Sequence, residues 1–239
     1  MAPPGAGTLV NALAILLGSG FGWAVGRRLP ERISQTLLQA MGLLVLVLGM
    51  QMALTLSSAA QAVTVLLALI GGAWLGEWSD LEAAFERLGQ ALEKQVSRWL
   101  GPSPIACAFV APSILFLVGP MTLLGSIQDG LGDPSLLLVK AALDGIATLA
   151  FTASLGWGTL FSALPVLLVQ GGVALLARQL QPLLRPDLLA ALEATGGILI
   201  LGIGINLLGL ARLRVANLLP ALLIVELLVG FFPLWDLDL

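Results

Sequence analysis

Two ionisable residues, Lys140 and Asp144, stand four positions apart inside a long apolar run of the chain. At this spacing both side chains lie on one face of a helix, so their ammonium and carboxylate groups can pair. Asp144 comes about ten residues after Ser135, roughly 15 Å along a helix and near the middle of a bilayer. The two residues form either a neutralised structural pair or a cation or proton site whose carboxylate changes partner during a cycle.

A third ionisable residue, Glu226, lies about twelve residues into an apolar run that starts at Val215, with no basic residue four positions away. A carboxyl group in such surroundings either exchanges a proton or stays protonated as a hydrogen-bonded packing residue. Glu193 comes only about five residues into its run, so we expect it near the membrane interface.

Gln128 and Asp129 stand among glycines after a proline-containing run. One interpretation is a flexible loop that presents carbonyl groups and side chains to a solute or ion, and the other is a plain connecting turn.

Amide side chains complete the candidate site residues. Gln51 and Asn206 lie in the later parts of two apolar runs, where an amide must find a hydrogen-bond partner. That partner is the other amide, a substrate or a neighbouring helix. Asn11 lies near the start of the first run, and Gln170 lies in a later one.

The composition shows what kind of element must position these residues. The chain has 239 residues, of which 58% are hydrophobic and 10% charged, whereas a soluble domain carries about 25% charged residues. There is no histidine, which excludes HExxH zinc sites and Ser-His-Asp triads. The single cysteine, Cys107, excludes an intrachain disulfide. We expect no enzyme activity, no cofactor and no nucleic-acid partner.

We predict an all-α, polytopic transmembrane helical bundle within a single membrane domain over residues 1–239. Eight apolar runs are long enough to be spans, at residues 8–26, 33–54, 62–78, 105–124, 135–155, 159–176, 188–210 and 215–232. If residues 135–155 form a re-entrant segment, the count is seven. The first run lacks the basic start and cleavage site of a signal peptide, so we expect it to be retained.

Residues 79–100 differ from the rest because charged residues are concentrated there and apolar ones recur every three or four positions. This pattern predicts an amphipathic connector helix on the membrane surface or under the bundle. Ser79 and Glu82 suggest a capping box at its start, and Gly101-Pro102 suggests its end. Residues 103–157 follow as central spans with a helix broken at Pro112 and Pro120.

An internal repeat relates residues 41–54 to residues 196–209. Gapless alignment gives four identities, at Gly42/Gly197, Leu44/Leu199, Leu46/Leu201 and Gly49/Gly204. The alternative is that two apolar helices match by composition. If residues 1–78 and 158–233 are three-span repeats separated by an odd number of crossings, they are inverted. Such repeats are common in secondary transporters, which bind substrate near the midplane between them.

Basic residues predict the orientation. With eight spans, eight lysines and arginines in loops and the connector face the cytoplasm, and two face outside. Both termini are then outside. Seven spans give the same count with the C-terminus inside.

Gly18, Gly22 and Gly26 are spaced by four and permit close helix contact. The contact is either within the chain or between copies in a homo-oligomer.

Several stretches together resemble one protein family, and they are Gly7-Thr8-Leu9-Val10-Asn11, Gly71-Gly72, Gly76-Glu77, Gly119-Pro120-Met121, Gly125-Ser126-Ile127-Gln128-Asp129-Gly130 and, after Lys140, Leu143-Asp144-Gly145. The family is the YqgA/YdfK-like bacterial inner-membrane proteins of unknown function (DUF554). The resemblance implies a multi-pass protein of the bacterial inner membrane and no particular substrate.

Three functions remain open. A small secondary transporter or permease for a small polar solute or ion explains the repeat, the broken helix and the midplane carboxyl groups. A small channel is the second, although it calls for a polar stripe along one helix and the polar residues look isolated. The third is a membrane scaffold or partner-binding subunit that docks through the amphipathic helix.

Overall fold

The computed structural model describes residues 3–100, 105–181 and 185–231, and within these ranges it is helical without strands, as predicted. Six segments are long and apolar enough to cross a membrane: α1 (Ala6–Gly26), α2 (Glu31–Ala53), α3 (Ala59–Ser79), α7 (Ser135–Leu155), the continuous Trp157–Leu175 segment and α10 (Pro186–Leu207). That continuous segment is the 3-10 turn η1 (Trp157–Ser162) followed by α8 (Ala163–Leu175).

The remaining elements are shorter, bent or too polar to count as spans. A bent pair, α5 (Ile105–Leu117) and α6 (Pro120–Gly130), would make a seventh span. The last predicted span is a shorter apolar segment, made of η3 (Val215–Leu218) and α11 (Pro220–Phe231). The other two helices are α4 (Leu81–Leu100) and α9 (Ala177–Leu180).

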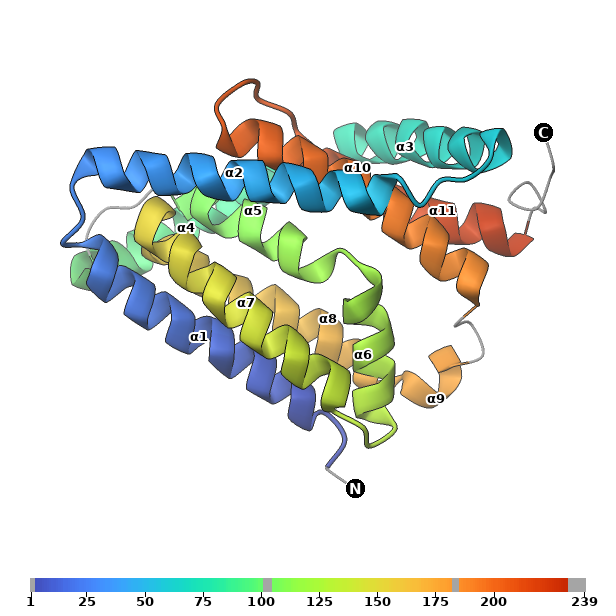
Figure 1. Cartoon of the computed structure of the whole chain (residues 1–239), viewed down its shortest axis with the longest axis horizontal. Coiled ribbons are helices and arrows are strands. Elements are labelled where there is room, and N and C mark those ends of the chain that lie inside the picture. The colour runs from blue at the N-terminus through green and yellow to red at the C-terminus, as the bar shows by residue number, and fades with distance from the viewer. Residues whose placement is uncertain (1–2, 101–104, 182–184, 232–239) are drawn as a thin grey trace. The chain divides into compact units, whose positions relative to one another are not determined.

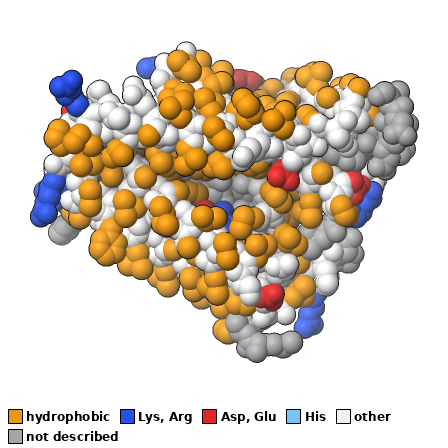
Figure 2. Space-filling view, in the orientation of Figure 1, with side chains coloured by type: hydrophobic (Ala, Val, Ile, Leu, Met, Phe, Trp, Pro, Cys, Tyr) orange, Lys and Arg blue, Asp and Glu red, His pale blue; other side chains and the backbone are white. Residues whose placement is uncertain are grey.

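The helices place apolar side chains outside and polar side chains inside. On α1, Leu17 and Phe21 are 63% and 66% exposed, whereas Asn11 and Ser19 are buried. Figure 2 shows hydrophobic side chains over most of the visible face, with most of the charged ones toward its edge. In water this arrangement would be costly, but lipid solvates apolar surface and leaves polar groups to bond internally. The chain is therefore a membrane-embedded helical bundle.

The predicted helix break is confirmed at Pro120, where α5 and α6 meet at a bend of 65°, and is wrong at Pro112, which lies inside α5. Pro120 lacks the N–H that would continue α5, and Gly119 has a φ of +125°, a conformation that side-chain-bearing residues rarely adopt. The Thr122 hydroxyl donates a 2.9 Å hydrogen bond to the carbonyl of Phe116 across the break, so it occupies an acceptor that the interrupted helix leaves free.

The predicted capping box is wrong. Ser79 ends α3, where its hydroxyl donates to the carbonyl of Leu75 at 2.7 Å. The N–H of Glu82 donates to the side chain of Asn217 at 2.7 Å, and the carboxylate of Glu82 accepts from the N–H of Ala216 at 3.0 Å. A distant segment thus caps α4 in place of the local pair. The side chains of α4 from residue 92 onward lie outside the described part, as do residues 101–102.

The chain forms two compact units that do not follow chain order. Unit 1 comprises residues 1–41, 85–117 and 121–182, and unit 2 comprises residues 42–84, 118–120 and 183–239. Each unit combines segments from both halves of the chain, whereas the sequence suggested one domain divided into consecutive repeats.

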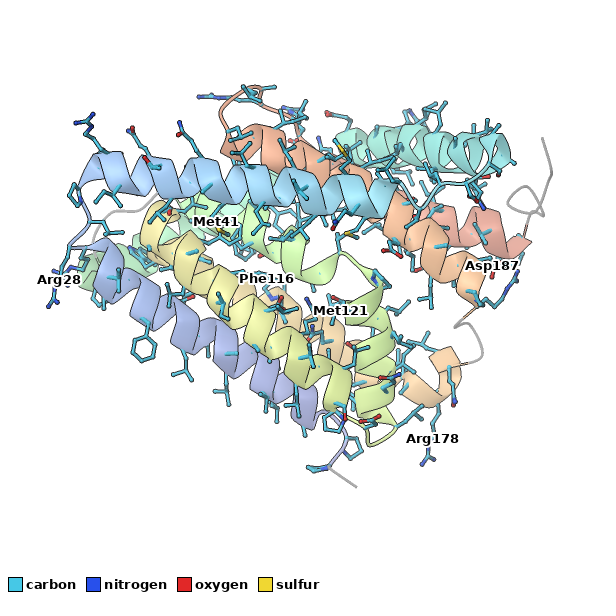
Figure 3. All side chains as sticks on the ribbon, viewed as in Figure 1. Arg28, Met41, Phe116, Met121, Arg178 and Asp187 are labelled. Atoms are coloured by element: carbon cyan, nitrogen blue, oxygen red, sulfur yellow. The ribbon has the colours of Figure 1, made fainter. Side chains whose placement is uncertain are left out.

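Within unit 1, α1 and α7 lie side by side and run parallel (Figure 1). Gly18, Gly22 and Gly26 contact the backbones of Gly145, Leu149 and Ala153 in that order. A Cβ on Gly26 would lie 2.8 Å from the carbonyl oxygen of Ala153, so this contact requires glycine. The glycine face is occupied by α7 of the same chain and is not open to a second copy. Arg28 and Arg178 lie at opposite ends of this unit (Figure 3).

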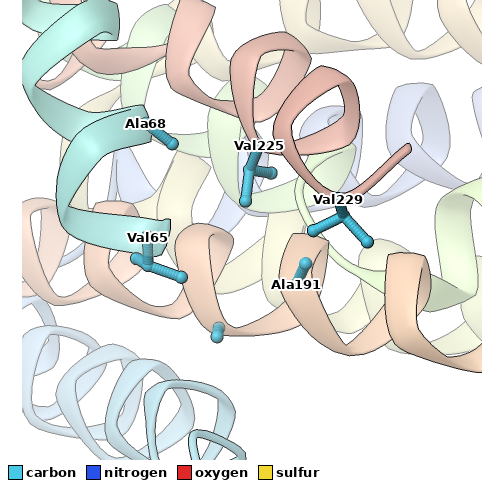
Figure 4. Close-up of a cluster of buried hydrophobic side chains, with 6 residues drawn as sticks. Val65, Ala68, Ala191, Val225 and Val229 are labelled. Atoms are coloured by element: carbon cyan, nitrogen blue, oxygen red, sulfur yellow. The ribbon is translucent and has the colours of Figure 1, made fainter. Parts of the chain in front are cut away.

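Within unit 2, the later part of α2 packs against α10 in antiparallel fashion. Gly42 contacts Leu208, Gly204 contacts Leu46, and Gly49 contacts the backbone of Gly197 and Leu201. A separate apolar cluster joins α3, α10 and α11 (Figure 4), and its buried members are Val65, Ala68, Ala191, Ala194, Val225 and Val229.

Candidate functional site

Lys140 and Asp144 form the ion pair that their spacing predicted, in the interior of unit 1. The ammonium nitrogen lies 3.0 Å from both carboxylate oxygens. The two residues are only 7% and 5% exposed. Because neither charge has access to bulk water, each depends on the other and on nearby polar groups for stabilisation.

Asn11 of α1 and Gln170 of α8 extend this pair into a four-residue cluster. The Asn11 amide nitrogen donates to the Asp144 carboxylate and to the Gln170 amide oxygen, both at 3.1 Å. The negative charge on Asp144 orients Asn11, since turning its amide would bring two oxygens together. Asn11 in turn orients Gln170.

The oriented amides leave two buried atoms without a hydrogen-bond partner, namely the acceptor Oδ1 of Asn11 and the donor Nε2 of Gln170. Both residues are fully buried. Buried polar atoms are nearly always paired, so an unpaired acceptor and donor in one cluster indicate a place for a ligand or water.

A polar stripe continues along α7 from this cluster, and this stripe was not predicted from the sequence. Thr148 and Thr152 follow Lys140 and Asp144 at the same four-residue spacing, and both are buried. The Thr148 hydroxyl donates to the Asp144 carbonyl at 2.5 Å, whereas the Thr152 hydroxyl has no partner. On α1, the buried Ser19 hydroxyl is also unpartnered. The repeated spacing of four was the available signal.

The structure corrects the interpretation of Gln128 and Asp129 as a binding loop or turn. Both residues lie in α6, which continues to Gly130. The buried Asp129 carboxylate accepts hydrogen bonds from the N–H groups of Gly7 and Thr8 at 2.8 and 2.9 Å, and from the Thr8 hydroxyl at 2.9 Å. Asp129 therefore caps the start of α1, and Gln128 is half-buried beside it.

The other candidates lie in unit 2 and do not form a cluster with one another. Asn206 does not bond Gln51: its amide pairs with the N–H and carbonyl of Leu213, each at 2.8 Å, and closes the loop after α10. Gln51 is exposed. Glu226 is half-buried on α11, and Glu193 is half-buried on α10.

The four-residue cluster thus offers one ammonium, one carboxylate, one free acceptor and one free donor. Across the described ranges, no three His, Cys, Asp or Glu side chains gather as a metal site would require. The cluster therefore places charged and hydrogen-bonding groups together inside an otherwise apolar bundle.

Comparison with known proteins gives the same broad picture. The family described as "Protein of unknown function (DUF554)" matches residues 6–230. Escherichia coli (strain K12) "Uncharacterized protein YqgA" is 31% identical over 96% of this chain and 98% of its own length. Bacillus subtilis (strain 168) "Uncharacterized membrane protein YdfK" is 31% identical over 91% and 93%. No solved structure matches significantly.

Proposed function

The chain belongs to the DUF554 family, and we propose that it is a small secondary transporter or permease for a small polar solute or ion. Its place would be the bacterial inner membrane. The observation that carries the proposal is the buried cluster of Asn11, Lys140, Asp144 and Gln170, with its unpaired acceptor and donor. Ionisable groups inside a membrane bundle are costly and usually serve a transport pathway. We assign this cluster binding and passage, not catalysis.

An inverted repeat is part of the proposal. Asn11 and Gln170, near the start of the first run and in the later run expected to match it, are hydrogen-bonded to each other. Gly49 and its repeat equivalent Gly204 both lie in the antiparallel contact between α2 and α10. A pseudo-two-fold axis in the membrane plane brings a helix of one repeat into contact with its equivalent in the other repeat.

The parallel packing of α1 and α7 supports eight spans. Three crossings between them return the chain to the side where α1 began, and these are α2, α3 and the bent α5–α6 pair. Phe85 and Phe109 pack against each other at the end of unit 1 where α7 is followed by Trp157, whereas Asp129 caps the start of α1. The bent pair therefore extends from one end of unit 1 to the other, as a span does.

A ligand screen tests the proposal. Binding to the folded state raises the unfolding temperature, so thermal shifts of the purified protein are measured over a panel of solutes and ions. At least one ligand should stabilise the wild type and not Asp144→Asn. A complete absence of shifts would favour a membrane scaffold.

A channel is the second candidate, and the polar stripe on α7 favours it. The two functions differ in flux. Transport by a carrier saturates at low substrate concentration, whereas a channel gives unitary currents in a planar bilayer.

A further inference from the structure

We propose that the cluster binds a small uncharged solute with a carboxamide or urea group, which donates a hydrogen bond to Asn11 and accepts one from Gln170. This inference rests on the proposed transport function and names its substrate class. The atoms that carry it are the acceptor Oδ1 of Asn11 and the donor Nε2 of Gln170. Both are buried and have no partner, although their side chains are hydrogen-bonded to each other. An acceptor and a donor left unpaired together call for a ligand with one group of each kind.

The charged members of the cluster are already occupied. Both carboxylate oxygens of Asp144 lie 3.0 Å from the Lys140 ammonium, and one of them also accepts from the Asn11 amide. The pair is neutral as a whole, and the described side chains of α1, α5, η1 and α8 around α7 carry no charge. Asp129 on α6 is bonded to the start of α1. A charged ligand would therefore add an uncompensated charge to apolar surroundings, whereas an uncharged ligand leaves the pair intact.

The distance between the two unpaired atoms suits a single functional group. The amides of Asn11 and Gln170 share a 3.1 Å hydrogen bond, and the nitrogen and oxygen of one amide are about 2.2 Å apart. The Asn11 oxygen and the Gln170 nitrogen are therefore at most about 8 Å apart. One carboxamide with a hydrogen bond of about 2.9 Å at each end spans the same distance.

A bound carboxamide would close a ring of three amides. Asn11 donates to Gln170, Gln170 would donate to the ligand, and the ligand would donate to Asn11. Hydrogen bonds in such a chain strengthen one another in an apolar interior. Asp144 sets the direction of the ring, because it accepts from the Asn11 nitrogen and leaves the Asn11 oxygen for the ligand. The Lys140–Asp144 pair thus positions Asn11 and does not itself bind the solute.

Unpaired hydroxyl groups continue from the cluster in one direction. Ser19 follows Asn11 on α1 by just over two helical turns, and Thr152 follows Asp144 on α7 by the same distance. Because the two helices run parallel (Figure 1), both hydroxyls lie about 12 Å farther along, toward the same end of unit 1. Both are buried and without a partner. A hydroxyl both donates and accepts, so this second group suits an uncharged solute and marks its passage.

Four molecules of nearly the same size test the class of ligand on the purified full-length protein. Acetamide carries the donor and the acceptor, acetone lacks the donor, and acetate and acetamidinium carry a negative and a positive charge. We expect acetamide alone to raise the unfolding temperature with saturation, because a site built to bond an N–H group rejects an analogue without it. A ligand with so few atoms binds no tighter than roughly tens of micromolar, so the series is measured at millimolar concentrations.

Two glutamine variants test whether the cluster is the site. Gln170→Met removes the free donor at nearly constant volume and should abolish the shift by acetamide. Gln35→Met should keep it, since the exposed Gln35 amide bonds Glu31 on its own helix, outside the cluster. In liposomes, uptake of radiolabelled urea should saturate with the wild type, fall to the level of protein-free liposomes with Gln170→Met, and slow with Thr152→Val. If Gln170→Met does not fold, the ligand series on the wild type carries the test.

The positioning role of the ion pair has its own readout. The double variant Lys140→Met with Asp144→Asn leaves no charge unpaired, but an amide at position 144 both donates and accepts, so Asn11 can turn. The acetamide concentration that gives half of the full thermal shift should then rise about tenfold. An unchanged concentration would refute the positioning role.

The proposal is overturned if acetone stabilises the protein as acetamide does, or if acetamide stabilises Gln170→Met as much as the wild type. It is also overturned if acetamide has no effect while acetate, acetamidinium, glycerol or another member of the wider panel stabilises the wild type. In that case the transport function stands with a different substrate class. If no solute or ion acts, both fail.

Discussion

The Asn11 side chain donates a 3.1 Å hydrogen bond to the amide oxygen of Gln170, which joins α1 to α8 in the core of unit 1. Because the same Asn11 nitrogen also contacts Asp144, a change of charge on α7 is transmitted directly to both neighbouring helices. The Asp144 carboxylate and the amides of Asn11 and Gln170 thus form one oriented hydrogen-bonded chain across three helices.

The first prediction concerns this ion pair. Asp144→Asn leaves Lys140 as an unpaired buried cation and should lower the free energy of unfolding by about 3–5 kcal/mol. Lys140→Met in the same chain removes that charge and should restore most of the stability. Thermal unfolding in detergent measures both. Full recovery of transport in the double variant would make the pair purely structural.

The second prediction compares two glycines of α1. A Cβ on Gly18 would collide with the backbone of Gly145, whereas nothing lies within 4 Å of a Cβ on Gly20. Gly18→Ala should therefore cost roughly 1–3 kcal/mol by forcing α1 away from α7. Gly20→Ala should be neutral or stabilise the helix by about 0.5–1 kcal/mol. Equal unfolding temperatures for the two variants would contradict the packing.

The helices and the Lys140–Asp144 pair were predictable because they depend on local sequence. Long apolar runs must form helices in lipid, where every backbone group needs an internal partner. The four-residue spacing placed both charges on one face, and Pro120 predicted the break between α5 and α6.

The partners across the chain were not predictable from local patterns. Asp129 looked like a loop residue because glycines flank it, but lipid favours continuation of the helix, and its partners Gly7 and Thr8 lie more than 120 residues away at the start of α1. The role of Gln170 likewise depends on the packing of α8 against α1. Thr148 and Thr152 looked isolated because threonine is common in apolar helices, and only their shared spacing with Asp144 distinguished them.

The third prediction tests Asp129 as the cap of α1. Asp129→Ala removes a buried carboxylate that accepts three hydrogen bonds, and should lower the free energy of unfolding by about 1–3 kcal/mol. Hydrogen exchange at Gly7 and Thr8 should accelerate most. Asp133→Asn is the matched control, since the Asp133 carboxylate is exposed and accepts hydrogen bonds from Ser135, which lower its pKa. A larger effect at Asp133 than at Asp129 would refute the capping role.

The fourth prediction concerns topology. In a Cys107→Ala background, Pro4→Cys and Asp133→Cys should be labelled from the same side of the membrane, because α1 and α7 begin together. Arg28→Cys should be labelled from the other side, which the basic residues identify as the cytoplasm. A membrane-impermeant maleimide applied before and after lysis makes the measurement. Labelling of Asp133→Cys from the same side as Arg28→Cys would contradict the parallel packing of α1 and α7.

The last prediction concerns Glu226, which lies half-buried on α11 with exposed Leu223 and Leu227 nearby. Within the described part of the chain it has no ion-pair partner, so Glu226→Gln removes a charge without leaving another unpaired. The unfolding temperature should change by no more than about 2 °C. Glutamine keeps the size and the hydrogen-bonding groups but does not exchange a proton. If Glu226 carries a proton during transport, uptake by the variant should become independent of pH, and an unaltered pH profile would assign the residue to packing.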